Sequence, residues 1–179
     1  NSYKYSSKTI KLDLIDFLID KIKFIFKKNN FRDDAIESVL SLKEAKNYLF
    51  PILHKRVSLI NEIKDTHEFK LFLLNFKRLD NIIKSIKFSN ESNLKVDTTL
   101  FESSEEQIIY NKTEKLNFNL KKYLIDQDTQ KIFLEEVVNL QSPINVFLDK
   151  IIVMHDYKKI KNNRLILLTR LRDGIVKFC

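Results

Sequence analysis

A short run near the end of the chain combines a tyrosine with lysines, asparagines and an arginine. It covers residues 157–164 and reads Y-K-K-I-K-N-N-R. Lysines neutralise phosphates, asparagine side chains hydrogen-bond the edges of unstacked bases, and a tyrosine ring stacks on a base. Lysines at the N-terminal end of a helix also add to the positive potential of the helix dipole, which favours phosphate. The candidate RNA-binding residues of this run are Tyr157, Lys158, Lys161, Asn162, Asn163 and Arg164.

The same run also fits a solvated, lysine-rich turn, and Arg164 has a second interpretation of its own. At 100° per residue Arg164 falls between Ile160 and Leu168, inside the apolar arc of the helix. A guanidinium on a core-facing position needs a partner, because an unpaired buried charge is very costly. We expect either an internal salt bridge to Asp149 or Asp156, or an arginine that faces the substrate at the lip of a helical bundle.

A second set of basic residues follows one line along an earlier helix. Lys70, Lys77 and Lys84 are spaced by seven residues, and Arg78 lies on the opposite side of the same helix. A lysine line can follow a phosphate backbone, since lysine acts as a flexible point charge. It can equally form a solvated border whose aliphatic stems cover apolar surface. All four residues are candidate RNA contacts, and both interpretations stay open.

The residues offer no catalytic or metal centre. His54, His67 and His155 show no ligand spacing, and the single cysteine, Cys179, gives no zinc pattern and no intramolecular disulfide. One glycine cannot build a phosphate-binding loop. We therefore expect no metal and no catalytic residue, and the cysteine usage is consistent with a reducing cytoplasm.

Composition predicts an all-α fold and leaves the question of an RNA partner open. One glycine and two prolines in 179 residues argue against α/β and all-β folds, which use these residues in turns. No apolar run is long enough to span a membrane. The net charge of +8 invites a nucleic acid. Lysine, asparagine, isoleucine and phenylalanine are all abundant, however, as in AT-rich genomes, so part of this charge can come from codon bias.

Periodicity and capping residues predict a bundle of about six to eight helices, organised as a linker over residues 1–8 and one helical domain over residues 9–179. Pro51 predicts a break near Phe50. Ser41 with Glu44, Asp65 with Glu68, and Ser103 with Glu106 have the spacing of capping boxes. The expected helices cover residues 9–29, 33–40, 41–64, 65–87, 103–125 and 128–139, with a loop over 88–98. Two more begin at Ser142, with Pro143 as the first helical residue, and at Asp156. The apolar stripe expected for the first of these two consists of Ile144, Phe147, Leu148, Ile151 and Ile152, and that for the second of Ile160, Leu167, Leu168, Leu171 and Ile175.

The last forty residues carry a resemblance to a known family. They contain P-I-x-x-F-x-D-x-x-x-V-M-x-D over 143–156 and N-R-L-x-L-L-x-x-L-R over 163–172. Similar blocks occur in the same order at 31–40, 76–78 and 96–102. This pattern resembles the C-terminal, DALR-type anticodon-binding domain of the bacterial glycyl-tRNA synthetase beta subunit. The family's Asp-Ala-Leu-Arg tetrad falls at 158–161, which reads K-K-I-K here, so a role for a bidentate arginine at position 161 is in doubt.

The resemblance implies a segment of a longer beta subunit that belongs to glycine–tRNA ligase, an enzyme that uses ATP to join glycine to tRNA-Gly in the cytoplasm. The segment would grip the anticodon arm and hold no catalytic site and no cofactor of its own. The implied partners are tRNA-Gly and the alpha subunit, with no membrane. Two alternatives remain: an arginyl-tRNA synthetase-like anticodon-binding domain, or a helical protein-interaction module that does not bind RNA.

Overall fold

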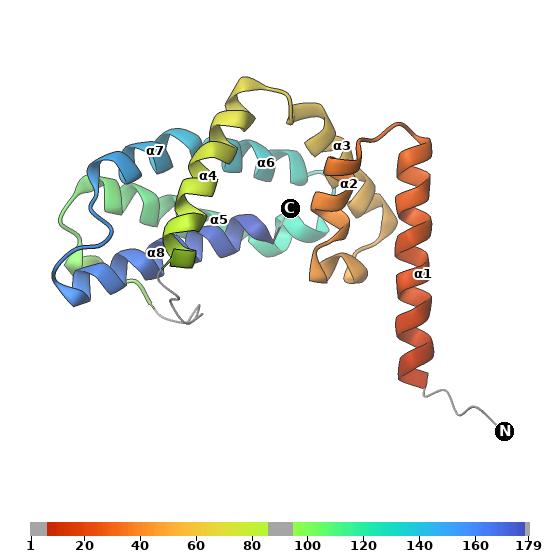
Figure 1. The fold of residues 1–179 in the computed structure, drawn as a ribbon, viewed down its shortest axis with the longest axis horizontal. Coiled ribbons are helices and arrows are strands. Elements are labelled where there is room, and N and C mark those ends of the chain that lie inside the picture. Colours follow the sequence, from red (N-terminus) through yellow and green to blue (C-terminus); the bar gives the residue numbers. More distant parts are fainter. Residues whose placement is uncertain (1–6, 86–94, 178–179) are drawn as a thin grey trace. The chain divides into compact units, whose positions relative to one another are not determined.

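The computed structural model describes residues 7–85 and 95–177, and within these ranges every regular element is helical (Figure 1). The predicted all-α class is confirmed. None of the described helices is both long and apolar enough to cross a membrane. The elements are α1 (Ser7–Lys28), α2 (Asp33–Leu40), the 3-10 helix η1 (Lys43–Asn47), α3 (Phe50–Ile63), α4 (His67–Ser85), the 3-10 helix η2 (Thr98–Leu100), α5 (Ser104–Ile125), α6 (Gln130–Val138), α7 (Gln141–Lys150) and α8 (Lys158–Val176).

The helices group into two compact units, one up to Glu62 and one from Ile63 onward. The sequence was interpreted as one domain over residues 9–179 that follows a linker over 1–8. Helix α1 already begins at Ser7, inside that expected linker. Each unit has its own apolar core, and the candidate RNA-binding residues all belong to the second unit.

The first unit is built around Phe26, which is fully buried at the end of α1. Its ring lies 5.6 Å from the rings of Phe31 and Phe50 and 5.8 Å from that of His54. Helix α1 ends before Asn30, which has a φ of 61° and so turns the chain in the left-handed region. The apolar side chains buried in this core are Phe26, Ala35, Ile36, Val39, Leu40, Ala45, Leu53, Val57 and Ile60.

The break predicted at Pro51 is confirmed, whereas the predicted capping box at Ser41 is wrong. Pro51 lies in the first turn of α3, where its missing N–H removes no helical hydrogen bond. Ser41 instead ends α2, because its N–H donates to the carbonyl oxygen of Glu37 at 3.0 Å. The sequence from residue 41 to 64 therefore forms η1 and α3 rather than one helix.

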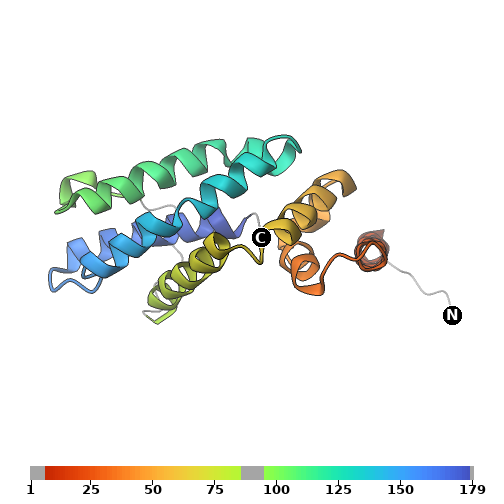
Figure 2. The same cartoon turned by 90° about the horizontal axis from the view of Figure 1, so that it is seen from above.

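In the second unit α4 crosses the other helices and packs against α7 and α8, while α5 packs against α6, α7 and α8 (Figures 1 and 2). The apolar stripe predicted for α8 is confirmed, because all its members are buried. That stripe consists of Ile160, Leu167, Leu168, Leu171 and Ile175.

The predicted helix starts in this unit are partly right. The capping box of α5 is confirmed, since the Ser103 hydroxyl accepts from the N–H of Glu106 and the Glu106 carboxylate accepts from that of Ser103. Helix α4 is capped by Thr66 rather than Asp65, as the Thr66 hydroxyl accepts from Phe69 N–H at 3.3 Å. Helix α7 begins at Gln141, ahead of the predicted Ser142 cap, and Tyr157 rather than Asp156 precedes α8.

Gly174 allows α8 to approach α5 closely. A Cβ at this position would lie 2.6 Å from Asn117 Oδ1 and 3.2 Å from Leu116 Cδ2. Alanine favours a helix over glycine by about 1 kcal/mol, and the Asn117 amide can turn aside. We therefore expect Gly174→Ala to stay within about 1 kcal/mol of the wild type, and the bulkier Gly174→Val to destabilise the second unit by about 1–3 kcal/mol. Thermal unfolding monitored by circular dichroism tests this, and equal stability of both variants would contradict it.

Candidate nucleic-acid interface

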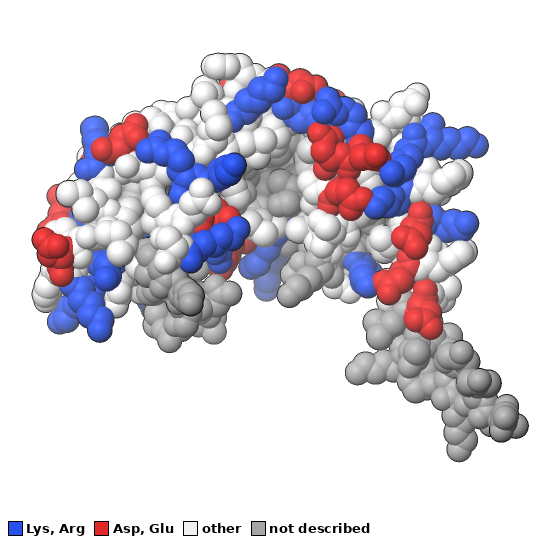
Figure 3. All heavy atoms as spheres, viewed as in Figure 1, with Lys and Arg blue, Asp and Glu red and all other residues white. Residues whose placement is uncertain are grey.

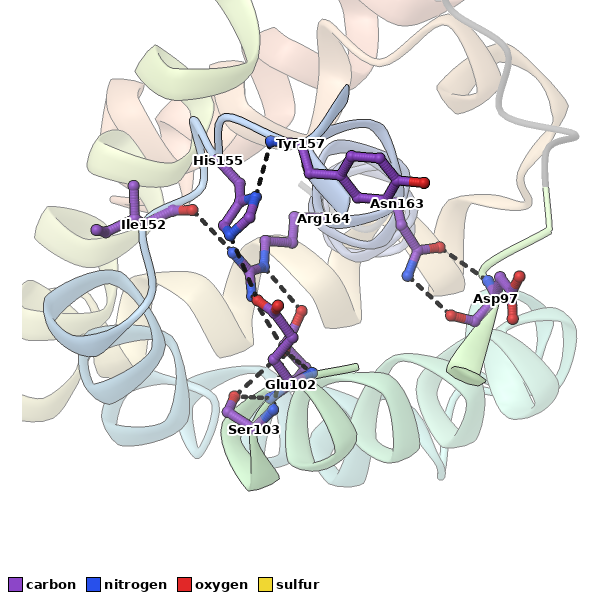
Figure 4. Close-up of polar contacts among 9 residues, drawn as sticks. Asp97, Glu102, Ser103, Ile152, His155, Tyr157, Asn163 and Arg164 are labelled. Atoms are coloured by element: carbon purple, nitrogen blue, oxygen red, sulfur yellow. Dashed lines mark hydrogen bonds and ion pairs between the residues drawn. The ribbon is translucent and has the colours of Figure 1, made fainter. Parts of the chain in front are cut away.

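Arg164 is the centre of a buried polar network at the start of α8 (Figure 4). The residue is 4% exposed, which confirms the core-facing position predicted from the sequence. Its Nε donates to Glu106 Oε1 and its Nη2 to Glu102 Oε2, both at 2.8 Å. Its Nη1 donates to the carbonyl oxygen of Ile152 at 3.0 Å.

The predicted salt bridge therefore exists, but its predicted partners are wrong. Asp149 accepts from Arg78 Nη2 at 2.8 Å instead, and Asp156 is exposed beside Tyr157. Glu102 and Glu106 come from the start of α5, which is far from α8 in the sequence but packs against it. Helical spacing places a residue on a face and cannot tell which distant carboxylate meets that face.

Burial and hydrogen bonding act on the pKa of Glu106 in opposite directions. Burial works to raise the pKa of the Glu106 carboxyl. The hydrogen bonds from Arg164 and from the backbone N–H groups of Glu102 and Ser103 lower it further than burial raises it, so the pKa lies below its ordinary value. The same pair raises the pKa of Arg164 despite its burial. Both groups are therefore charged at neutral pH.

Asn163 also has its polar atoms occupied inside the fold. Its side chain is 4% exposed, accepts from Asp97 N–H at 2.8 Å and donates to the Asp97 carbonyl oxygen at 2.9 Å. These bonds tie the segment before η2 to α8. Asn163 and Arg164 were predicted as RNA contacts. Both are buried, and their side chains are hydrogen-bonded inside the fold, so we interpret them as residues that hold α8 to the segments around it.

The loop between α7 and α8 presents apolar side chains beside this network. It covers residues 151–157, and its Ile152, Met154 and Tyr157 are 72%, 51% and 53% exposed. Val153 between them is 6% exposed and anchors the loop in the core. The N–H of Tyr157 donates to His155 Nδ1 at 3.0 Å, and His155 Nε2 lies 3.6 Å from Glu102 Oε2 (Figure 4).

Three lysines lie in the first turn of α8. Lys158 and Lys159 are exposed, and Lys161 and Asn162 are half-buried. None of these lysines forms an ion pair within the part of the chain that the structure describes, and the exposed Asp156 beside them is likewise without one. Figure 3 shows several separate groups of basic atoms with acidic atoms between them on the face drawn. The positive surface of this face is therefore local.

The basic residues of α4 do not join this group. Lys70, Lys77 and Lys84 are exposed, as predicted for a line on one face, but Lys84 pairs with Asp80 at 2.5 Å. Asp80 also lies 3.9 Å from Arg172 of α8. Since Arg172 and Lys158 are separated by about 21 Å along the helix axis, the contact between Asp80 and Arg172 lies far from the lysine-rich end of α8.

Arg78 has partners on α7. It donates to Asn145 Oδ1 at 3.1 Å and to Asp149 Oδ1 at 2.8 Å. An exposed arginine with these partners ties α4 to α7, and its charge is balanced by Asp149.

The exposed loop after α7 was not predicted from the sequence. Ile152 was placed on a buried apolar stripe that continued from Phe147, yet α7 ends at Lys150 and Ile152 is 72% exposed. The acidic partners of Arg164 were equally missed, although Glu106 had been identified as a capping residue. A glutamate that caps a helix has further oxygen lone pairs that can accept hydrogen bonds. Glu106 could therefore have been considered as a partner for the core-facing Arg164.

The described residues contain no group of three His, Cys, Asp or Glu side chains that could hold a metal ion. A hollow of about 170 Å³ lies between α5, α6 and the start of α7. Its Lys115 is paired with Glu136 at 2.6 Å, which raises the pKa of Lys115 and leaves Lys112 as the other cation of the hollow.

Sequence comparison finds similar proteins, although no protein-family model matches the chain. A protein of Buchnera aphidicola subsp. Schizaphis graminum (strain Sg) is 30% identical over 175 residues, and one of Listeria monocytogenes serotype 4b (strain CLIP80459) is 31% identical over 173 residues. Each alignment covers 97% of this chain. Both proteins are glycine–tRNA ligase beta subunits, as is one of Sulfurihydrogenibium sp. (strain YO3AOP1), 29% identical over 89% of this chain. The chain is homologous to the glycine–tRNA ligase beta subunit.

The resemblance inferred from the motifs is thereby confirmed. The chain spans 24%, 23% and 22% of the lengths of these three beta subunits, and it matches their C-terminal part. The N-R-L-x-L-L pattern that carried the resemblance includes the buried Asn163 and Arg164. The glycine–tRNA ligase motif at 163–172 thus marks residues that organise the fold of this end.

Proposed function

We propose that this chain binds the anticodon arm of tRNA-Gly as the C-terminal segment of a glycine–tRNA ligase beta subunit. The observation that carries the proposal is the exposed Tyr157 at the start of α8 together with lysines that form no ion pair among the described residues, in a chain homologous to that subunit. The whole enzyme would use ATP to attach glycine to tRNA-Gly in the cytoplasm. By resemblance to the family, its alpha subunit would supply the activation chemistry.

The start of α8 suits an RNA backbone on electrostatic grounds. The N-terminal end of a helix carries a partial positive charge, and Lys158 and Lys159 add two full charges that have no acidic partner within residues 7–85 and 95–177. Placing like charges there costs stability, and a bound phosphate would remove that cost. Tyr157 stands next to them with half of its surface exposed, so a base adjacent to a bound phosphate can stack on its ring.

A helical protein-interaction module is the second candidate. It is favoured by large apolar side chains that are exposed on α5, such as Phe118 at 88% and Ile125 at 70%. The arginyl-tRNA synthetase-like alternative has no comparable support, since the relatives described above are all glycine–tRNA ligase beta subunits.

Charge reversal at the start of α8 tests RNA binding. Lys158→Glu/Lys159→Glu should weaken binding of a tRNA-Gly anticodon stem-loop by about 10–100-fold at 0.1 M salt, because two phosphate contacts are lost. The slope of log affinity against log salt concentration should become shallower by about 1.5 for the same reason. Fluorescence anisotropy at four salt concentrations measures both quantities.

The matched control is Lys121→Glu/Lys122→Glu. These two lysines are also adjacent and exposed, but they lie at the C-terminal end of α5, whereas Arg164 contacts its start. The control makes the same change in net charge and should alter affinity by less than about 3-fold. A third variant, Lys70→Glu/Lys77→Glu, tests the lysine line of α4. Weaker RNA binding by this variant would include the line in the RNA-binding surface. Equal losses in the α8 variant and the α5 control, or no salt dependence in the wild type, would refute the proposal.

A further inference from the structure

We propose that Arg164 acts as a positioning residue, holding the loop over residues 151–157 in a fixed shape so that the exposed side chains of Ile152, Met154 and Tyr157, together called the platform, can contact unpaired nucleobases. This inference rests on the proposed RNA binding and deepens it, since it names the part of the surface that would contact bases. Lysines can hold phosphates of any sequence or shape, whereas a platform of this kind distinguishes an open RNA loop from a closed helix.

The first step of the argument is how Arg164 connects the loop to α5. Its guanidinium is planar, and its donors have a fixed mutual geometry. Two of its nitrogens are held by Glu106 and Glu102, and the third donates to the Ile152 carbonyl oxygen at 3.0 Å. Because the carboxylates fix the plane of the guanidinium, they also fix the position of the Ile152 backbone.

The second step is that the rest of the loop is held as well. The side chain of Val153 is buried, and the N–H of Tyr157 is bound by His155 Nδ1 at 3.0 Å. The other ring nitrogen of His155 lies 3.6 Å from Glu102, which already binds Arg164 (Figure 4). The loop is thus held to the rest of the unit by Arg164 and by the buried side chain of Val153, and the hydrogen bond between Tyr157 and His155 braces its end.

The third step concerns what the loop exposes. Its inward side chains are anchors, while Ile152, Met154 and Tyr157 are more than half exposed. Exposed apolar side chains on a rigid loop gain free energy when a flat apolar surface covers them. A tyrosine ring and a polarisable thioether both suit the face of a base.

The charges beside the loop favour RNA over an apolar protein surface as the occupant. Lys158 and Lys159 follow Tyr157 directly and have no acidic partner within the described ranges. Burying these two lysines against an apolar protein patch would leave their charges unpaired, which is energetically costly. A polyanion whose bases project from its backbone satisfies the lysines and the platform at the same time.

Two RNA probes with the same stem separate base contacts from backbone contacts. The first is the tRNA-Gly anticodon stem-loop, and the second replaces its loop by a compact tetraloop whose bases are stacked. Wild-type protein should prefer the open loop. Ile152→Ala/Met154→Ala/Tyr157→Ala should bind the open loop about 10–100-fold more weakly and lose the preference, with an unchanged salt slope, because the lysines remain.

Arg164→Lys tests the positioning role. It keeps the charge but loses the planar fork, so it should lose the open-loop preference while the salt slope stays the same. Amide hydrogen exchange in residues 151–157 should become faster, which shows that the loop has been released. Arg170→Lys in the same helix is the matched control: Arg170 pairs with Glu114 at 2.6 Å, away from the loop, and neither readout should change. Glu102→Gln keeps an acceptor for Arg164 and should retain most of the preference.

The outcomes separate this inference from the proposed function. If the wild type binds neither probe, the proposed function fails. If it binds RNA with the expected salt slope but the triple alanine variant matches it on both probes, the platform is refuted and RNA binding stands. The platform is also refuted if the triple variant binds both probes normally but no longer binds the purified alpha subunit, which would make the loop a protein-docking surface. The triple variant alters only exposed side chains, so this test does not depend on whether Arg164→Lys folds.

Discussion

Replacing Glu106 by alanine is expected to destabilise the second unit by about 3–5 kcal/mol. The change removes one partner of a fully buried ion pair, and Arg164 then keeps its charge in the interior with only Glu102 and one carbonyl oxygen. The same carboxylate completes the capping box of α5, so the start of that helix loses a cap as well. Hydrogen exchange of buried amides in α5 and α8 measures the loss.

Two controls separate the buried pair from ordinary effects of losing a carboxylate. Glu114 lies on α5, as Glu106 does, and is the half-exposed partner of Arg170 on α8. Glu114→Ala should therefore lower the free energy of unfolding by about 1 kcal/mol or less. The double variant Glu106→Leu/Arg164→Met removes both charges and should be more stable than Glu106→Ala, since no unpaired charge is buried. A double variant less stable than the single one would contradict this account.

The acid dependence of stability provides a further signature of the same pair. The pKa of Glu106 is lowered in the folded state, so its contribution is present above the ordinary value of 4.5 and is lost as the pH falls through the folded value. Glu105 behaves similarly, because hydrogen bonds from Lys150, from the backbone and from Ser104 lower its pKa to about 2. Below pH 4.5 the stability of Glu106→Ala should therefore fall less steeply than that of the wild type, with the remaining slope due to Glu105 and other carboxylates.

The second large effect is expected from Phe26→Ala in the first unit, at about 3–5 kcal/mol. Phe26 is fully buried, and its ring stacks on Phe50 and meets Phe31 edge-on, so alanine leaves a cavity and removes aromatic contacts. Hydrogen exchange in α2 and α3 should accelerate, while exchange in α5 and α8 reports whether the second unit responds.

Phe24→Ala is the matched control for this variant. It makes the same chemical change two residues earlier on α1, at a side chain that is 65% exposed. Its effect on stability should stay within about 0.5 kcal/mol. If the two variants were equally destabilised, the core of the first unit would not be centred on Phe26.

The sequence predicted the features that depend on local chemistry. The Ser103–Glu106 capping box, the break at Pro51 and the buried stripe of α8 each follow from the spacing of neighbouring residues, and all are confirmed. The predicted loop over 88–98 falls mostly outside the described residues, and its last position, Thr98, begins η2.

The features that depend on distant contacts were not predictable in the same way. Periodicity placed Arg164 in the core but could not identify Glu102 and Glu106, because the packing of α5 against α8 brings them there. Helix α7 was predicted to continue through Ile152, because the apolar character of an isoleucine does not distinguish a helix from an exposed loop. Of the candidate RNA contacts, Tyr157 and Lys158 remain on the surface, whereas Asn163 is held by Asp97.

The scarcity of glycine affects the folding entropy of the chain. The left-handed turn after α1 is made by Asn30 with a φ of 61°, and the only glycine, Gly174, serves close helix packing. An unfolded chain with so little glycine samples fewer backbone conformations. The chain therefore loses less conformational entropy when the two units fold. This smaller entropy loss offsets part of the strain that Asn30 accepts in the left-handed turn.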